Sequence, residues 1–197
     1  MNIILAGYIA LEASHRLIEN EKPALSCRFS DRFLKLSEEM TEREKLSRES
    51  INAVISDMNA DCGQAFAVDD SDIIELSELG IFGGLWALEE IHGRGLNIDL
   101  SKISIRQEVI EICEYMNVNP YTYPSQGTFI IRSDRAFELK DYFERNNIKA
   151  EVIGYETKDN DRVIVNEDEK RFLTPPDRLL KDEHDITDLR YTDKYVK

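Results

Sequence analysis

Residues 75–80, ELSELG, combine a hydroxyl, carboxylates and a glycine just before a stretch with helical spacing of apolar residues. The start of a helix exposes unpaired N–H groups and a partial positive charge, and a glycine there lets a phosphate approach. The candidate phosphate-site residues in this segment are Glu75, Ser77, Glu78 and Gly80. The structural alternative is that Ser77 caps the helix and its acidic neighbours occupy the first turn.

A second candidate segment, SQGT, follows Pro124 at the entry to an expected strand. Its residues are Ser125, Gln126, Gly127 and Thr128. Two hydroxyls around a glycine can bind a phosphate or a ribose hydroxyl through side-chain and main-chain donors. An ordinary turn after Pro124 explains the same residues equally well, so both interpretations stay open.

Other groupings give weaker chemical signals. His15, His92 and His184 lack metal-ligand spacing, and Ser14 beside His15 cannot form a nucleophile and base pair, because adjacent helix residues point apart. Oxygen ligands in the run Asp69-Asp70-Ser71-Asp72 suit Mg²⁺, but we expect a solvated loop there. Trp86 is expected in the core. The sequence therefore predicts no catalytic residue and no metal site.

Helical and strand patterns alternate over the central part of the chain, which predicts an α/β fold of helices packed on a mixed sheet. Expected strands are residues 2–6, 64–68, 96–100, 128–131 and 152–155, with a hairpin of 162–165 and 171–173. Expected helices are residues 8–19, one capped by Ser30, 47–58, one from Ser77 or Leu79 to Gly93, 105–116, and one around 137–143. Residues 38–48 are expected to form a solvated linker or helix face, and 69–72 a polar loop.

Composition narrows the classes of partner and compartment. The chain has 39 acidic and 25 basic residues and a formal net charge of −14, which repels nucleic acids and acidic membrane surfaces. Its apolar start reaches Glu12 and His15 too early for a span of roughly 20 apolar residues. Cys27, Cys62 and Cys113 form no CxxC pair, so no disulfide framework is expected. We expect a soluble, cytoplasmic protein.

Several separated motifs resemble one family in the family's own order. They are IILAGYIALEAS, GIFGGLWALEEIHGRGLNIDLSKISIRQEVIEICEYMNVNPY, PSQGTFII and NDRVIVNEDEKRFLTPP. Together they resemble the C-terminal domain of the aminoimidazole ribonucleotide synthetase superfamily, and most of all its branch with the hydrogenase-maturation dehydratase. The resemblance implies a synthetase-like domain over residues 1–176, with an exit strand and helical segment in 1–60 and an α/β core in 61–176. A charged tail, 177–197, follows.

The motifs of this chain depart from the family pattern at identifiable places. Near residues 74–80 the family resembles His-Asp-x-Thr-Glu-Gly-Gly; here Ile74 replaces His and Leu79 replaces the first Gly, while Glu78 and Gly80 are unchanged. At residues 125–128 the family resembles Ser-Ser-Gly-Ser, so Gln126 is the marked change.

The third matching segment is residues 7–14, where the family resembles Lys-Trp-x-Gly-Leu-Glu-Gly-Thr. Ala10 and Ala13 take the places of glycines. Alanine favours a helix by roughly 0.5–1 kcal/mol over glycine and blocks close backbone approach. We therefore interpret Glu12 as an acid on a helix surface.

The resemblance implies ATP-dependent chemistry shared with a second domain. In the family, ATP and Mg²⁺ are held largely by an N-terminal domain, and loops of the C-terminal domain close the cleft. Such an N-terminal half is not recognisable in this sequence, so we expect no cofactor on this chain alone, and a homo-oligomer or a separate N-terminal-domain subunit. The chain lacks a C-terminal cysteine, so thiol chemistry at that end is not expected. The alternative is a degenerate, non-catalytic binding or regulatory domain.

Overall fold

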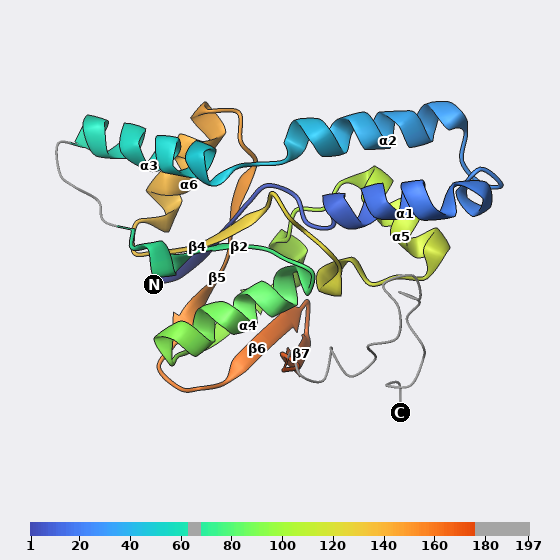
Figure 1. The fold of residues 1–197 in the computed structure, drawn as a ribbon. Coiled ribbons are helices and arrows are strands. Elements are labelled where there is room, and N and C mark those ends of the chain that lie inside the picture. Colours follow the sequence, from blue (N-terminus) through green and yellow to red (C-terminus); the bar gives the residue numbers. More distant parts are fainter. Residues whose placement is uncertain (63–67, 176–197) are drawn as a thin grey trace.

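The computed structural model describes residues 1–62 and 68–175, and these residues form one mixed sheet flanked by helices (Figure 1). The strand order across the seven-stranded sheet is β2-β4-β1-β5-β3-β6-β7. The strands are β1 (Asn2–Ala6), β2 (Ile73–Glu75), β3 (Gly95–Asp99), β4 (Phe129–Ser133), β5 (Ala150–Thr157), β6 (Arg162–Asn166) and β7 (Glu169–Phe172). The predicted α/β class is confirmed.

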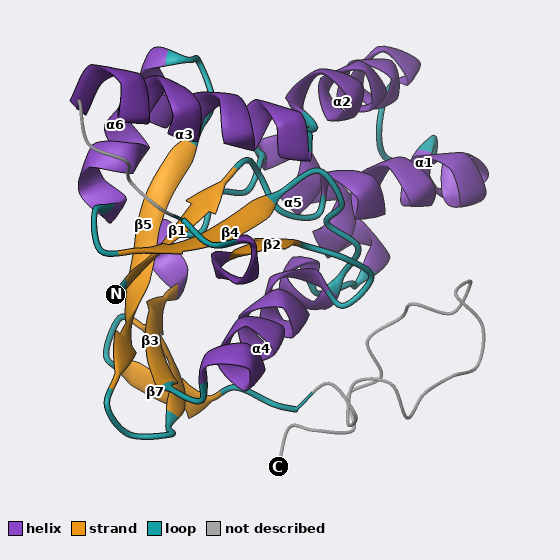
Figure 2. Cartoon of the chain, turned by 60° about the vertical axis from the view of Figure 1, so that its left-hand side comes forward, coloured by secondary structure: helices purple, strands orange, loops and turns teal. Residues whose placement is uncertain are grey.

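Six α-helices pack on the described sheet or on one another (Figure 2). They are α1 (Leu11–Leu25), α2 (Asp31–Glu44), α3 (Arg48–Cys62), α4 (Gly80–His92), α5 (Gln107–Met116) and α6 (Ala136–Arg145). Short 3₁₀ turns η1 (Asp70–Asp72), η2 (Leu100–Lys102) and η3 (Pro120–Thr122) complete the connections. Figure 1 shows α2 running alongside α1, away from the sheet.

Strand β1 lies near the centre of the sheet and is buried on both faces. Ile3 and Leu5 belong to the core formed with α1, α4 and α5, whereas Ile4 and Ala6 belong to the core under α3 and α6. Alternate residues of a strand point to opposite faces, so one apolar strand supplies both cores. This double burial explains why residues 3–6, IILA, form a continuous apolar run.

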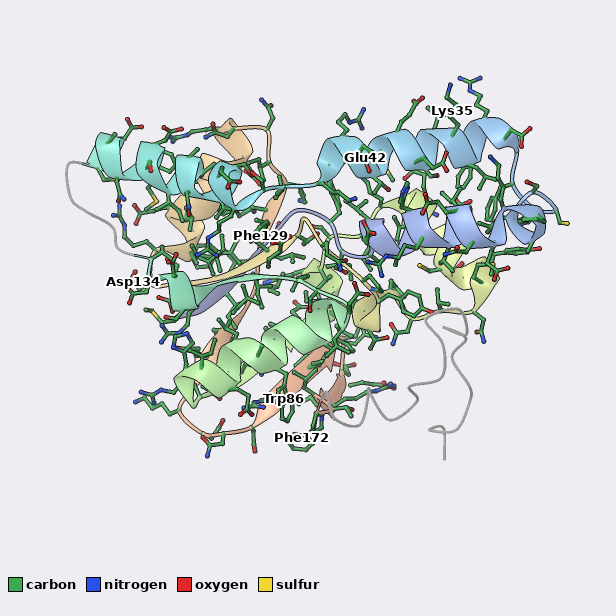
Figure 3. All side chains as sticks on the ribbon, viewed as in Figure 1. Lys35, Glu42, Trp86, Phe129, Asp134 and Phe172 are labelled. Carbon is green, nitrogen blue, oxygen red and sulfur yellow. The ribbon has the colours of Figure 1, made fainter. Side chains whose placement is uncertain are left out.

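Strand β4 pairs with both β1 and β2, and these pairings fix where the loops of the chain meet. Phe129 stands opposite Ala6 of β1 and opposite Glu75 of β2 in antiparallel register. The ends of β1 and β2 therefore meet the start of β4 around Phe129, which Figure 3 labels near the middle of the molecule. The loops after β1, after β2 and before β4 must lie together.

Most expected elements are confirmed, and the exceptions have local causes. The first helix begins at Leu11, because residues up to Ala10 form a turn. For residues 38–48 the helix alternative is confirmed as far as Glu44, where α2 ends, but Met40 and Thr41 are buried and not solvated. Strand β2 was not predicted, being three residues long. Residues 64–67 of the expected strand 64–68 lie outside the described part, as does the expected tail 177–197.

Helix α4 begins at Gly80, which has a positive φ of 59°. A Cβ atom there would lie 2.6 Å from the main-chain oxygens of both Tyr121 and Tyr123. Only glycine fits this contact between the helix start and η3. Gly93, which ends α4, has a similar φ of 61° but no heavy atom within 4 Å of its Cβ position.

We expect Gly80→Ala to destabilise the fold by roughly 2–5 kcal/mol, since it combines backbone strain with overlap against main-chain atoms that cannot rotate away. Gly93→Ala is the matched control and should cost only about 1–2 kcal/mol, the price of the left-handed conformation. Urea denaturation of both variants measures the difference. Equal losses of unfolding free energy in the two variants would show that the contact with η3 does not contribute to stability.

Candidate functional site

The two predicted candidate segments lie side by side and bond to each other. The Leu76 N–H donates to the main-chain oxygen of Thr128 at 2.8 Å, and the Ser125 N–H donates to the main-chain oxygen of Ser77 at 3.2 Å. Two further bonds use side chains: the Gly127 N–H donates to Glu75 Oε1 (3.1 Å), and Gln126 Nε2 donates to Glu78 Oε1 (2.6 Å). All eight predicted residues, Glu75, Ser77, Glu78, Gly80, Ser125, Gln126, Gly127 and Thr128, thus belong to one region.

The third matching segment, residues 7–14, joins the same region. The Ala10 N–H donates to Ser125 Oγ (2.8 Å), and Thr128 Oγ1 donates to the Tyr8 oxygen (2.6 Å). Ser125 and Thr128 are fully buried. Their hydroxyls therefore already hold the main chain of neighbouring loops together. We call residues 7–14, 75–80 and 125–128 the cleft segments.

Positive φ angles concentrate in the cleft segments. Gly7, Ala10, Gly80 and Gly127 all have φ between 58° and 96°. A residue other than glycine in this region costs about 1–2 kcal/mol, and such strain persists only where the surroundings impose it. Ala10 precedes α1 rather than continuing it, so the expected gain in helix propensity does not apply at that position.

The connection between α2 and α3 covers two of these glycines. The Leu46 N–H donates to the Gly127 oxygen at 2.8 Å, and a Cβ on Gly127 would lie 2.9 Å from Lys45 Cγ. A Cβ on Gly7 would lie 3.3 Å from Leu46 Cδ1. The backbone at these glycines is therefore approached by the chain's own residues.

Ser77 does not cap α4, so the structural alternative for that residue was wrong. The position before the helix is Leu79, which makes no side-chain capping bond. The Ser77 oxygen instead accepts from the N–H groups of Gly80 (3.1 Å) and Ser125 (3.2 Å). This turn shifts the helix start to Gly80, and η3 packs against it.

A network of ion pairs connects the cleft segments with α1 and α2. The Arg16 guanidinium holds Glu78 through two bonds, 2.7 and 2.8 Å, and its Nε donates to Glu12 Oε1 at 2.9 Å. Lys45 Nζ lies 2.8 Å from Glu12 and 3.5 Å from Glu42. Glu12 has a side chain only 16% exposed and bridges two cations, so its interpretation as a plain surface acid was wrong.

Sequence inspection missed both cations of this network. Arg16 follows Glu12 by four residues, a spacing that signals a helical ion pair. Lys45 gave no such signal, because it reaches the network from the end of α2, far along the chain.

These contacts keep the carboxylates ionised. Burial raises the pKa of Glu12, but hydrogen bonds from Lys45 and Arg16 outweigh it and hold that pKa below its usual value. The bond from Arg16 likewise lowers the pKa of Glu78. At neutral pH the network therefore contains charged acids paired with charged bases.

A second buried polar cluster lies beneath the other end of α4. Asp72, expected in a solvated loop, is buried in η1 and accepts from Arg132 Nη1 at 2.8 Å, with His92 Nε2 at 3.2 Å. Arg132 also pairs with Glu156. The Mg²⁺ alternative for this run is not supported, because Asp70 turns to Arg48 while Asp72 turns inward.

Within residues 1–62 and 68–175, no group of three or more His, Cys, Asp or Glu side chains is arranged to hold a metal ion. The same residues include no helix with the length and apolar character needed to cross a membrane. Trp86 is half-buried against the core, with the Arg162 guanidinium 3.9 Å from its ring centroid.

Glu89 of α4 is fully buried, and neither of its carboxylate oxygens has a hydrogen-bond partner. Four charged groups act electrostatically on the Glu89 carboxyl: Glu156, Arg162, Arg132 and the N-terminal ammonium. Burial, reinforced by the charge of Glu156, raises the pKa of Glu89 to about 7. The folded protein therefore binds a proton here more tightly than the unfolded chain does.

Comparison with known proteins gives a fold relationship. No protein-family model and no curated protein sequence matches the chain. Among solved structures, HypE from E. coli superimposes with a TM-score of 0.66 at 13% identity, over 88% of this chain and 49% of its own. HypE in a HypE–HypF complex gives 0.63 at 15% identity, over 89% and 52%.

Thiamine-monophosphate kinase from Stenotrophomonas maltophilia K279a is also similar, with a TM-score of 0.57 at 12% identity, over 85% of this chain and 50% of its own. The chain has the fold seen in these structures of HypE and thiamine-monophosphate kinase. The expected resemblance is thus confirmed as a fold. The chain spans about half the length of these solved structures.

Stability should fall as pH rises, because the pKa of Glu89 is raised from 4.5 to about 7. The stabilisation from its bound proton is complete below the unfolded value and is lost as pH rises through about 7, a change on the order of 3 kcal/mol. Glu89→Gln should remove this part of the pH dependence in denaturation series at pH 5 and pH 8.5.

Glu90→Gln is the matched control, because Glu90 is the next residue of α4 and its side chain is 61% exposed. It should retain the wild-type pH dependence. An unchanged slope in the Glu89 variant would show that the buried carboxyl does not titrate in this range.

Proposed function

We propose that this chain forms one wall of a nucleotide or phosphate cleft, closed on its other side by a separate nucleotide-binding half. The observation that supports this best is the convergence of the three cleft segments, which lie far apart in the sequence, at one end of β1, β2 and β4. The left-handed backbone of Ala10, a residue that disfavours it, adds support, since strained residues cluster at functional sites.

Arg16 and Lys45 are the cations that a phosphate would use on this wall. The two-pronged contact of Arg16 with Glu78 has the geometry in which a guanidinium also holds a phosphate. The Glu78 side chain is 54% exposed, so the pair is open to solvent on the carboxylate side. An incoming phosphate can therefore reach Arg16 and compete with the carboxylate for it.

The second half would supply Mg²⁺ and most nucleotide contacts. One structure of HypE contains ATP, and one of thiamine-monophosphate kinase contains AMPPCP and TMP. Those proteins are about twice as long as the part this chain matches. A HypE–HypF complex is also known, which favours assembly with another protein as the working state.

The second candidate is a binding or regulatory domain without catalysis. One supporting observation is that Lys45 and Leu46 pack against Gly127 and Gly7. Another is that carboxylates already pair with Arg16 and Lys45. In such a domain the network would close the cleft, and partner proteins would recognise the closed surface.

Titration of the ¹⁵N-labelled chain with Mg-ATP tests the first proposal. Amide signals of Lys45, Gly127 and Glu78 should shift with weak, millimolar affinity, because one wall alone offers few contacts. Arg16→Met and Lys45→Met should each weaken binding roughly tenfold, the effect of losing one charge-assisted bond of about 1.4 kcal/mol.

Arg43→Met is the matched control, since Arg43 lies on α2 with its side chain 74% exposed and should bind as the wild type does. Adding a neighbouring gene product that carries a glycine-rich, aspartate-bearing half should tighten the affinity for Mg-ATP. No shift of Lys45, Gly127 or Glu78, with or without that half, would refute the proposal and favour the regulatory domain.

A further inference from the structure

A second feature of the molecule adjoins the cleft segments: an open hollow of about 360 Å³ beside the turn that follows β1. It is lined by Tyr8, Ser101, Lys102, Ile103, Ser104, Ile105, Lys149 and Glu151. This volume falls in the range of small-molecule sites. The cleft network of Arg16, Glu78 and Lys45 does not line it.

The turn after β1 separates the hollow from the cleft and is held from both sides. The Gly7 N–H donates to the Lys149 oxygen (2.8 Å), and the Ile9 N–H donates to the Ser104 oxygen (3.1 Å). On the cleft side, Thr128 Oγ1 donates to the Tyr8 oxygen at 2.6 Å. The hollow therefore has a fixed position directly next to the proposed cleft.

The hollow has a positive charge in a strongly acidic protein. Lys102 is exposed and has no ion-pair partner among the described residues. Lys149 Nζ lies 3.8 Å from Glu151, whose carboxylate is closer to Lys140 of α6, at 3.2 Å. The one acid of the hollow is thus paired mainly with a base outside its lining, and both lining lysines keep their charge available.

Arg106 does not line the hollow but contacts its tyrosine, and it is paired with Glu44. Its guanidinium carbon lies 4.2 Å from the Tyr8 ring centroid, and its Nη2 donates to Glu44 at 2.6 Å. Its Nε is buried and has no hydrogen-bond partner. The aromatic ring that lines the hollow is therefore itself stacked against a positive charge.

We propose that this hollow binds the phosphoryl group of a small organic phosphate between Lys102 and Lys149. Two lysines present point charges suited to a dianion, and the Ser104 hydroxyl and the Tyr8 phenol can donate further bonds. The Ser101 hydroxyl already donates to Asp99 Oδ1 at 2.6 Å. That the hollow binds a second substrate next to the nucleotide rests on the proposed function. That the hollow binds a phosphoryl group is independent of the proposed function.

Titration of the ¹⁵N-labelled chain with inorganic phosphate, against sodium chloride at matched ionic strength, tests the site. Amides of Tyr8, Lys102, Ile103 and Lys149 should shift with phosphate only. Lys102→Met and Lys149→Met should each weaken binding roughly fivefold to tenfold. The main-chain bond from Gly7 to Lys149 is retained in the second variant, so its fold should persist.

Lys35→Met is the control, because Lys35 lies on the outer side of α2 with its side chain 76% exposed (Figure 3). It should bind phosphate as the wild type does. Glycerol 3-phosphate, a small organic phosphate, should shift the same amides at least as strongly.

Wild-type affinity in both lysine variants would overturn the proposal, as would phosphate shifts confined to Lys45 and Gly127. The second result would instead favour the cleft. A phosphate site at the hollow, combined with no shift of Lys45, Gly127 or Glu78 on adding Mg-ATP, would overturn the proposed function but support the site at the hollow.

Discussion

The pairing of β4 with two strands at once is the constraint on which the candidate site depends. Phe129 faces Ala6 on one side and Glu75 on the other, so three loops must leave the sheet at the same point. Both flanking strands are anchored by apolar side chains, and a slip of one residue would turn those side chains to the wrong face. The core thus positions polar loops that have little apolar content of their own.

In the region where these loops meet, acidic and basic side chains pair with one another. Arg16 and Lys45 are partnered by Glu78 and Glu12, and these contacts order the ends of α1 and α2 relative to the loops. The same contacts compete with any anion from outside. Whether the region works as a cleft wall or as a closed surface depends on the small free-energy difference between carboxylate and phosphate as partners.

Sequence periodicity anticipated the elements with strong apolar patterns. Helix α3 buries Ile51, Val54 and Met58, and the central strand β1 is a plain apolar run. Strand β2 escaped prediction because three residues are too few to show a period. Ser77 was misinterpreted because capping preferences describe isolated helix starts, whereas here main-chain bonds to Gly80 and Ser125 decide where the helix begins.

Predicting the candidate site required information that no local pattern contains. The motifs could be located individually, and their meeting follows from strand register. The partners of Glu12 and Glu78 were harder to foresee. Lys45, which pairs with Glu12, follows the end of α2, and the residues around it in the sequence do not indicate that contact. The buried state of Asp72 likewise depends on Arg132, sixty residues away.

Ala10 shows how strongly its surroundings set the shape of the turn after β1. It is fully buried with φ of 58°, a backbone shape natural to the glycine that the resemblance places there and unfavourable for alanine. Its N–H bond to Ser125 and the packed surroundings impose that shape despite the residue's own preference. The path of this loop is therefore set by its main-chain bonds and its packing, and it holds even where the residue at the turn is not glycine.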